Sequence, residues 1–414
     1  MSEENFLDYN EEESELSEQV KICREAFSRG ELAKLDFSEE EFDTLLGFFA
    51  DEYEDKLLLA LSRIACQRYP YSSELIVKYS DALIINEEPE KAVEILERQL
   101  GLNSSNSDVY FLLGRGEIKM KNFEIAQQYI NHALIFSPDG QDDMLSSIAL
   151  DFMEAAQYDR ALEYLMRVYK NNSEDIIVCN DIAFCLERTE RYEESLEYYY
   201  KCIEADPFNS NIWFNIGTVN ATIEEFDKAI EAFDYSLALE PDNSSVMYNK
   251  AVVFLNLSQY DKAAEILEDF LVYEPEDYSA LTAIADCYLK LGQGDKAEKY
   301  MKMLLEFDQN NIEAYSSLAY ISLVRQEYDK SLDYLRILIG KENVNYNLLE
   351  DDLYIAFQKT GLPEFLVYYV AAEYFIDDQA GLLSGFEQLL EFDEVWQNML
   401  YRLVPELNFF NQNT

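Results

Sequence analysis

The sequence predicts an all-α protein built from stacked, antiparallel pairs of helices. The first observation is a helix–turn–helix pattern that returns every 34 or 35 residues. The second is that each return places small residues, large apolar residues and a proline at matching positions. The third is composition: 49% of the 414 residues are hydrophobic, which is enough for a large buried core.

The turn between the two helices of each repeat is the easiest landmark to align. Copies that share this turn follow one another at the repeat period, and one of them, QGDKAEKYM, is poorer than the rest. The copies are NFEIAQQYI, QYDRALEYL, RYEESLEYY, EFDKAIEAF, QYDKAAEIL, QGDKAEKYM and EYDKSLDYL, which begin at Asn122, Gln157, Arg191, Glu225, Gln259, Gln293 and Glu327.

The best copy is IWFNIGTVNATIEEFDKAIEAFDYSLALEPDN, residues 212–243, and its side-chain sizes explain how two helices can pack. Antiparallel helices approach closely only where side chains are small, so Gly217, Ala229 and Ser236 are predicted at the crossings. The large side chains expected to fill the space on either side are those of Trp213, Ile216 and Phe233.

Pro241 predicts the end of the second helix of this copy. It has no backbone N–H to donate, and it disfavours helical backbone at the preceding residue, Glu240. The polar residues that follow, Asp242, Asn243 and Ser244, are natural caps for the next helix. The prolines expected to act in the same way in other repeats are Pro70, Pro138, Pro207 and Pro275.

The period and the size pattern together resemble the tetratricopeptide repeat, a helix–turn–helix unit. The resemblance covers about residues 39–376. Asn220 departs from it at a position that is usually aromatic, and Ser236 replaces the usual alanine. The resemblance implies a right-handed α–α superhelix, or solenoid, of antiparallel helix pairs. Units are expected to begin near Glu39, Ser73, Ser107, Asp142, Ile176, Ser210, Ser244, Tyr278 and Ile312.

Five segments are predicted along the chain. Residues 1–17 are rich in acids and are expected to form a disordered tail. Residues 18–38 are expected to form an amphipathic N-terminal helix that caps the first repeat, with docking elsewhere as the alternative. Residues 39–345 hold nine repeats, and residues 346–380 hold a degenerate tenth helix pair with the turn GLP. Residues 381–414 supply one or two capping helices, which the open end of a solenoid needs.

The charge of the chain limits the classes of partner it can bind, and other sequence features indicate its location. The 32 basic and 82 acidic residues give a formal net charge of -50, which argues against nucleic-acid and membrane-surface binding and permits basic partners. The opening MSEENFLDYNEEE is unlike a signal peptide, and no apolar run reaches membrane-spanning length. The six cysteines form no CxxC pair and suggest no disulfide framework. The expected location is therefore the cytoplasm.

No catalytic or metal-binding constellation is expected, and no cofactor is predicted. His132 is the single histidine, so no second imidazole can join it as a ligand or base. Cys179 and Cys202 replace core residues and act as small hydrophobes. Calcium loops and Gly-rich phosphate loops are absent from the sequence, and PDGQDD from Pro138 fits a turn with a helix cap. Repeats and caps fill nearly the whole chain, so the sequence predicts that it is not an enzyme.

The resemblance implies that positions 2, 5, 6, 9, 12 and 13 of each first helix line a concave face. In the repeats 210–243 and 244–277 these positions carry no charge, a local exception in so acidic a chain. An asparagine side chain can donate to a peptide carbonyl and accept from a peptide N–H, so Asn215 and Asn249 resemble two rungs of an asparagine ladder. The candidate peptide-binding residues are Asn180, Phe184, Asn211, Phe214, Asn215, Thr218, Tyr248, Asn249 and Asn256.

Asp181 and Ala283 interrupt this ladder on either side, so the ladder is expected to be short. An alternative is that the groove residues bind only water or neighbouring turns. Another mode of the family clamps a C-terminal carboxylate with lysine and arginine side chains. We reject that mode because the groove cations are scattered; they are Lys78, Arg115, Lys119, Arg188 and Lys290.

These observations predict a non-enzymatic scaffold that binds an extended peptide or protein segment in the concave groove. The alternative is an acidic, chaperone-like protein that holds basic clients by its overall electrostatic field. Salt distinguishes the two hypotheses, because binding by the overall field falls steeply with ionic strength. In either case the expected partner is a protein or peptide, without nucleic acid or membrane.

Overall fold

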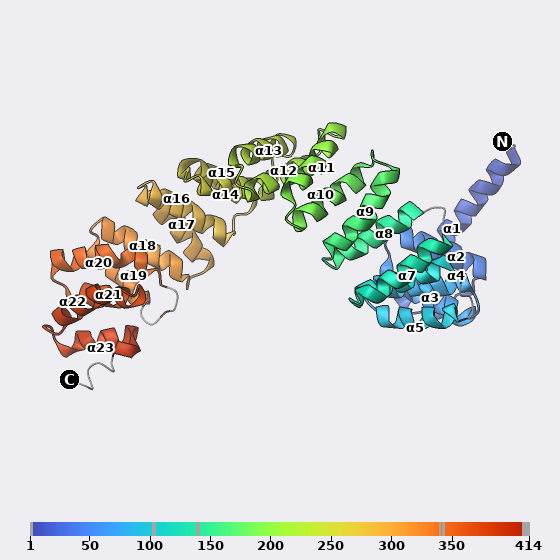
Figure 1. Cartoon of the computed structure of the whole chain (residues 1–414). Helices are drawn as coiled ribbons and strands as arrows, with labels where there is room; N and C mark the ends of the chain where they lie inside the picture. The colour runs from blue at the N-terminus through green and yellow to red at the C-terminus, as the bar shows by residue number, and fades with distance from the viewer. Residues whose placement is uncertain (1–2, 102–104, 138–140, 339–340, 342–343, 408–414) are drawn as a thin grey trace. The chain divides into compact units, whose positions relative to one another are not determined.

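The computed structural model describes residues 3–101, 105–137, 141–338, 341 and 344–407. Every regular element within those ranges is a helix, which confirms the predicted all-α helical-repeat class. Most of these helices follow one another as antiparallel pairs along the chain (Figure 1).

The first compact unit spans Met1–Pro207. α1 begins at Glu3, inside the segment for which the sequence predicts disorder, and glutamate and leucine are good helix formers. Pro138, expected to end a second helix, lies outside the described residues. The helices are α1 (Glu3–Arg29), a 3-10 turn (Leu32–Lys34), α2 (Glu39–Asp51), α3 (Asp55–Arg68), α4 (Ser73–Ile85), α5 (Pro89–Leu100), α6 (Ser107–Lys119), α7 (Phe123–Phe136), α8 (Gln141–Glu154), α9 (Tyr158–Asn171), α10 (Ile176–Arg188) and α11 (Tyr192–Ala205).

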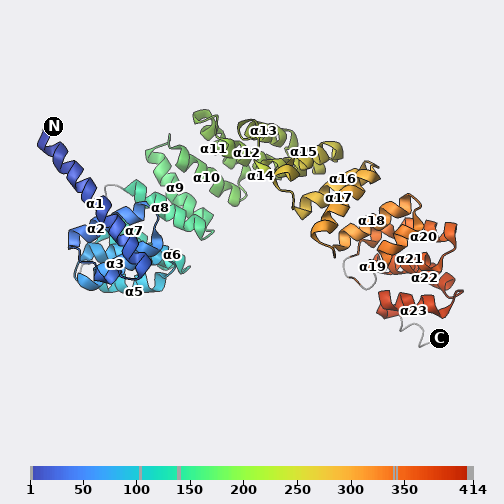
Figure 2. The same ribbon diagram turned by 180° about the vertical axis from the view of Figure 1, so that it is seen from behind.

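The second compact unit spans Phe208–Thr414, and Figure 2 shows its helices from the side opposite to Figure 1. The expected tenth helix pair is α20 with α21, and α22 and α23 lie in the segment where capping helices are expected. The helices are α12 (Ser210–Thr222), α13 (Phe226–Leu239), α14 (Ser244–Asn256), α15 (Tyr260–Tyr273), α16 (Tyr278–Lys290), α17 (Gly294–Phe307), α18 (Ile312–Val324), α19 (Tyr328–Leu338), α20 (Tyr346–Thr360), α21 (Pro363–Phe375), α22 (Gln379–Leu389) and α23 (Glu394–Leu403).

Side-chain caps set the start of the first helices in the second unit. Asn243 accepts a hydrogen bond from the backbone N–H of Val246 at 3.2 Å, and Asp277 accepts from that of Ala280 at 2.7 Å. Asn209 caps α12 in the same way. These caps satisfy N–H groups that have no partner inside the helix, so local sequence decides where each of these helices begins.

The crossing of α12 and α13 leaves no room for a side chain at Gly217. A Cβ atom built there would lie 2.5 Å from two ring carbons of Phe233, and that ring is fully buried. At the other crossing, the hydroxyl of Ser236 donates to the backbone carbonyl of Ser210 at 2.9 Å. Small residues therefore stand where the two backbones approach each other, as the sequence pattern predicts.

The turn inside each repeat holds one residue in the left-handed region of backbone space. Gly292 takes this conformation without strain in one repeat, whereas residues with a side chain take it in the others. Each of those carries a strain of about 1 kcal/mol. They are Tyr53, Glu87, Lys121, Ala156, Glu190, Glu224, Ser258 and Gln326, with φ between 55° and 62°.

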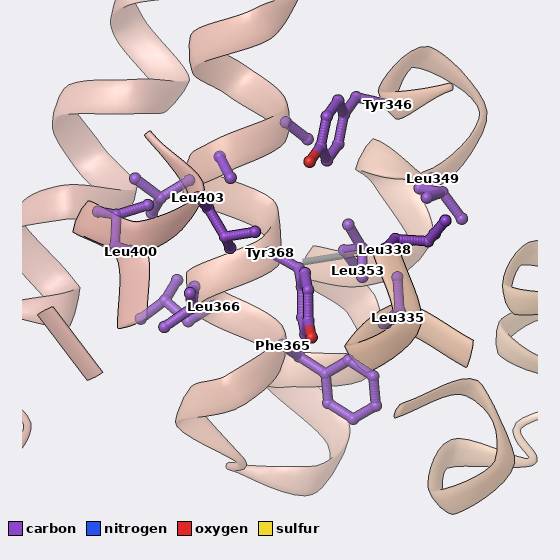
Figure 3. Packing of buried hydrophobic residues seen from close by; sticks show 14 of the residues in the cluster. Leu335, Leu338, Tyr346, Leu349, Leu353, Phe365, Leu366, Tyr368, Leu400 and Leu403 are labelled. Carbon is purple, nitrogen blue, oxygen red and sulfur yellow. The ribbon is translucent and has the colours of Figure 1, made fainter. Parts of the chain in front are cut away.

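The C-terminal end of the second unit packs around α21. This helix is apolar on nearly all sides, and it contacts both α20 and α23. Figure 3 shows Tyr368 on the side of α21 that holds Leu338 and Leu353, and Leu366 on the side that holds Leu400. Because α20 and α23 cover it on two sides, α21 buries its apolar surface without a further repeat.

Candidate functional site

The first helices form the more closely spaced layer of each unit. Within the second unit α12 contacts α14, and within the first unit α4 contacts α6. In the described part of the chain from α2 to α19, neighbouring second helices make no contact as extensive as these. A layer with closer spacing is the inner layer of a curved array, so α12 and α14, which carry most of the candidate residues, belong to the inner layer.

A pocket lies at the N-terminal end of α14, on this inner layer. Its volume is about 360 Å³, and two of the predicted residues, Tyr248 and Asn249, form part of its wall. The other lining residues come from the start of α14, from the end of α15 and from the start of α16. They are Ser244, Ser245, Phe270, Glu274, Asp277 and Ser279.

The two asparagines at position 6 have different hydrogen-bonding states. The Asn249 amide donates to the backbone carbonyl of Ser245 at 2.8 Å, which leaves its second N–H and its Oδ1 atom for other partners. Asn215 is half-buried, and its side chain has no hydrogen bond to any other described residue. The amide of Asn215 therefore keeps both its donor and its acceptor groups available for a further partner.

The aromatic candidates are supported from behind by buried rings. The Tyr248 ring lies 5.5 Å from the ring of Phe270, measured between centroids, and the Phe214 ring lies 6.1 Å from that of Phe233. Tyr248 and Phe214 are both half-buried, so their neighbours do not cover them completely. Packing of this kind holds the rings in place without covering them completely.

The remaining candidates of the second unit differ in which of their hydrogen-bonding groups are available to a ligand. The Thr218 hydroxyl donates to the carbonyl of Phe214 at 3.1 Å, so it offers mainly its acceptor lone pairs. Asn211 and Asn256, at opposite ends of the two helices, are exposed.

Two candidates, Asn180 and Phe184, lie on α10, which belongs to the first unit. Both are half-buried, and the Phe184 ring meets that of Tyr158 edge to face, with centroids 5.9 Å apart. Between them in sequence, burial raises the pKa of Asp181 to about 6, and its hydrogen bond to Asn180 offsets this only in part. Asp181 is thus a carboxyl group held in a partly desolvated position.

With the exception of Arg188, the groove cations of the first unit are paired with acids from neighbouring repeats. The Arg115 guanidinium binds Asp151 through Nε at 2.7 Å and Asp81 through a terminal nitrogen at 2.8 Å. Lys78 binds Asp43 at 2.5 Å. Because these cations already have carboxylate partners, they are poorly suited to clamp the carboxylate of a ligand.

The pattern of groove positions did not find Phe270, Glu274 and Asp277, which also line the pocket. The position pattern covers only first helices, whereas Phe270 belongs to α15, Glu274 is its C-terminal cap residue, and Asp277 caps α16. The spacing of the N-cap before each first helix is the signal that could have placed Asp277 beside the groove.

His132, Cys66 and Cys185 have ordinary structural roles. The His132 ring meets that of Tyr110 edge to face, with centroids 5.1 Å apart. Burial raises the pKa of Cys66 and of Cys185 to about 12, which removes them as nucleophiles. In the part of the chain that the structure describes, no three His, Cys, Asp or Glu side chains are placed to hold a metal ion. Nor does any described helix combine the length and apolarity needed to cross a bilayer.

Comparisons with known proteins agree with the repeat pattern. Models of the tetratricopeptide repeat match residues 177–209, 214–268 and 258–319. Among solved structures, the C-terminal part of a tetratricopeptide repeat-containing protein from Cytophaga hutchinsonii is similar with a TM-score of 0.50 and 16% identity, over 58% of this chain and 99% of that one.

Two further structures are similar over a smaller share of the chain. A structure of MamA has a TM-score of 0.39 and 22% identity, over 41% of this chain and 94% of that chain. A structure of YrrB, a tetratricopeptide repeat protein with an unusual peptide-binding site, has a TM-score of 0.38 and 21% identity, over 48% of this chain and 98% of that one. No curated protein matches the sequence.

Proposed function

We propose that this chain, which is a tetratricopeptide repeat protein, is a non-catalytic scaffold that binds an extended peptide or protein segment across α12 and α14. Proteins of this family are in general interaction scaffolds without catalytic activity. The observation that carries the proposal is a neutral surface of asparagines and aromatic rings on two adjacent first helices of a chain with a net charge of -50.

The chemistry of this surface suits a peptide backbone better than a charged group. Asn215 offers a complete amide, and Asn249 offers one N–H and its Oδ1 atom. A peptide unit presents one donor and one acceptor, so each asparagine can exchange a pair of hydrogen bonds with it whatever the bound sequence is. Phe214 and Tyr248 supply apolar contact beside those bonds. Asn180 and Phe184 remain candidates for similar contacts in the first unit.

A second candidate function rests on the charge alone. A net charge of -50 attracts basic clients over the whole surface, without need of a groove. Such binding weakens steeply when salt screens the field, whereas hydrogen bonds and apolar contacts in a groove are less sensitive.

Affinity capture from the native cell's lysate separates the two functions. The wild type is compared with Asn215→Ala/Asn249→Ala, and with the control Asn131→Ala/Asn310→Ala, which removes two exposed amides elsewhere. Each protein is used at low and at high salt, after circular dichroism has shown that it is folded. The groove function predicts a client that survives high salt and is lost only by the first variant. Clients that vanish in salt and bind all three proteins equally would replace it with the electrostatic function.

A further inference from the structure

We infer that the pocket beside Tyr248 receives an arginine side chain of the bound segment. This inference rests on the proposed function, because the pocket adjoins the residues that would hold the peptide backbone. Tyr248 and Asn249 belong to the pocket and to the candidate groove alike. A side chain that leaves the backbone at Asn249 would therefore enter the pocket directly.

The charge of the pocket calls for a cation. Glu274 and Asp277 are its only charged lining residues, and neither takes part in an ion pair with any described residue. The Glu274 carboxylate accepts one long hydrogen bond, 3.4 Å from the Ser244 hydroxyl, and Asp277 accepts the cap bond of α16. Each carboxylate keeps several free lone pairs, so both can accept from a guanidinium group.

The shape of the wall favours arginine over lysine. The rings of Tyr248 and Phe270 form an apolar wall, and a planar guanidinium stacks on such rings while its edge donates hydrogen bonds. Its five N–H donors match the acceptors around the pocket better than the compact, strongly hydrated ammonium of lysine does. The acceptors are the two carboxylates, the Asn249 Oδ1 atom and the exposed Ser245 hydroxyl.

The ends of two helices act against a cation here, and their effect is the smaller one. α14 and α16 both begin at the pocket, and each helix N-terminus carries a partial positive charge of about half a unit. Asn243 and Asp277 already cap these ends. The two full negative charges of Glu274 and Asp277 outweigh the two half charges.

The preceding repeat provides a comparison inside the same unit. Glu240 stands where Glu274 does, but the cap there is Asn243, and the Asn243 amide donates to Glu240 at 3.2 Å. That repeat therefore has one carboxylate, already engaged, where the pocket has two. The second carboxylate, Asp277, is what makes the pocket suited to a guanidinium.

Selection from a displayed library of random peptides tests the inference with the full chain. Peptides of about nine residues span about 30 Å when extended, and about 0.5 M NaCl shortens the Debye length to about 4 Å, so the overall field selects little. The test variant is Glu274→Gln/Asp277→Asn, which keeps a capping asparagine. The control is Glu240→Gln/Asp242→Asn, which removes the same charge one repeat away. Asn215→Ala/Asn249→Ala is selected in parallel.

The expected result is an arginine at one fixed position among peptides selected by the wild type and the control, and its loss in selections with the test variant. Replacing that arginine by citrulline, which has the same shape without the charge, should weaken binding about ten-fold. Selected peptides that require Asn215 and Asn249 for binding are called asparagine-dependent. The arginine pocket would be overturned if they have no fixed arginine, if lysine is equally frequent at that position, or if the test variant still selects the arginine. Each of these results leaves the proposed function intact. Finding no asparagine-dependent peptide would remove both.

Discussion

Replacing Gly217 by alanine is a direct test of how the repeats pack. The new Cβ atom would lie 2.5 Å from two ring carbons of Phe233 and 3.0 Å from a third. Ordinary contacts between carbon atoms are about 3.5–4.0 Å, so the ring or the helices must separate by about 1 Å. Phe233 is fully buried, so its ring has no open space to enter.

Two opposing terms set the size of the effect. Overpacking a tight core costs about 1–3 kcal/mol of unfolding free energy. Alanine in place of glycine inside a helix returns about 1 kcal/mol through backbone entropy. The 2.5 Å approach to a fully buried ring places the overpacking cost in the upper part of its range, about 2–3 kcal/mol, so we expect a net loss of about 1–2 kcal/mol for Gly217→Ala. Combining it with Phe233→Leu, which removes the ring, should cost less than the two single changes added together.

The chain provides a local probe for this measurement. Trp213 lies on α12 and stacks on Tyr235 with centroids 4.6 Å apart, and Trp396 is the only other tryptophan. In a Trp396→Phe background, urea unfolding followed by tryptophan fluorescence reports the α12–α13 pair. Gly47→Ala is the control, because a Cβ atom built at Gly47, inside α2, has nothing within 4 Å. We expect urea unfolding followed by circular dichroism to show that this control is more stable than the wild type. An equal gain for Gly217→Ala, or no coupling with Phe233→Leu, would refute the packing explanation.

Three other changes have expected outcomes that urea unfolding can measure. Arg115→Met should destabilise the first unit by about 3 kcal/mol, because it leaves the buried carboxylate of Asp151 and the partly exposed carboxylate of Asp81 without their cation; a loss under 1 kcal/mol would contradict this. Asn220→Leu should stabilise the second unit by about 1 kcal/mol, because it removes a buried Oδ1 atom that has no partner. For Asp181, the folded pKa of about 6 lies above the ordinary value of 3.8, so its ionised form destabilises the fold at neutral pH. Asp181→Asn should therefore be more stable than the wild type at pH 7, by about 1 kcal/mol after solvent screening. That gap should close between pH 6 and pH 4, and a gap independent of pH would contradict the assignment.

The helix positions could be read from the sequence because the constraints that set them are local and periodic. Gly217 is small because Phe233 faces it, and Asn243 caps α14 three residues before the N–H that it binds. Eight of the nine expected first helices begin at the residue where the sequence places a repeat, and α8 begins one residue early, at Gln141. The start of α1 at Glu3 was missed because the charge pattern and the helix propensity of glutamate point in opposite directions.

The candidate site could be read only in part. The repeat pattern predicts the positions of Tyr248 and Asn249 on their first helix, and both residues line the pocket. Its other wall comes from Phe270 and Glu274 in α15 and its cap, and from Asp277 before α16. Which of these side chains meet depends on how three helices pack, and a pattern of positions along one helix does not contain that information. The bond from Asn249 to the Ser245 carbonyl likewise depends on a rotamer choice.

A photocrosslinking experiment tests the central claim, that a client lies along α14. Benzoylphenylalanine replaces Val252, which is 37% exposed on α14 between Tyr248 and Asn256. In a matched protein it replaces Val272, which is 75% exposed on the second helix of the same repeat. Groove binding predicts that the captured client crosslinks to the Val252 position and not to the Val272 position. Equal crosslinking at both, or crosslinking at the Val272 position alone, would contradict binding in the groove.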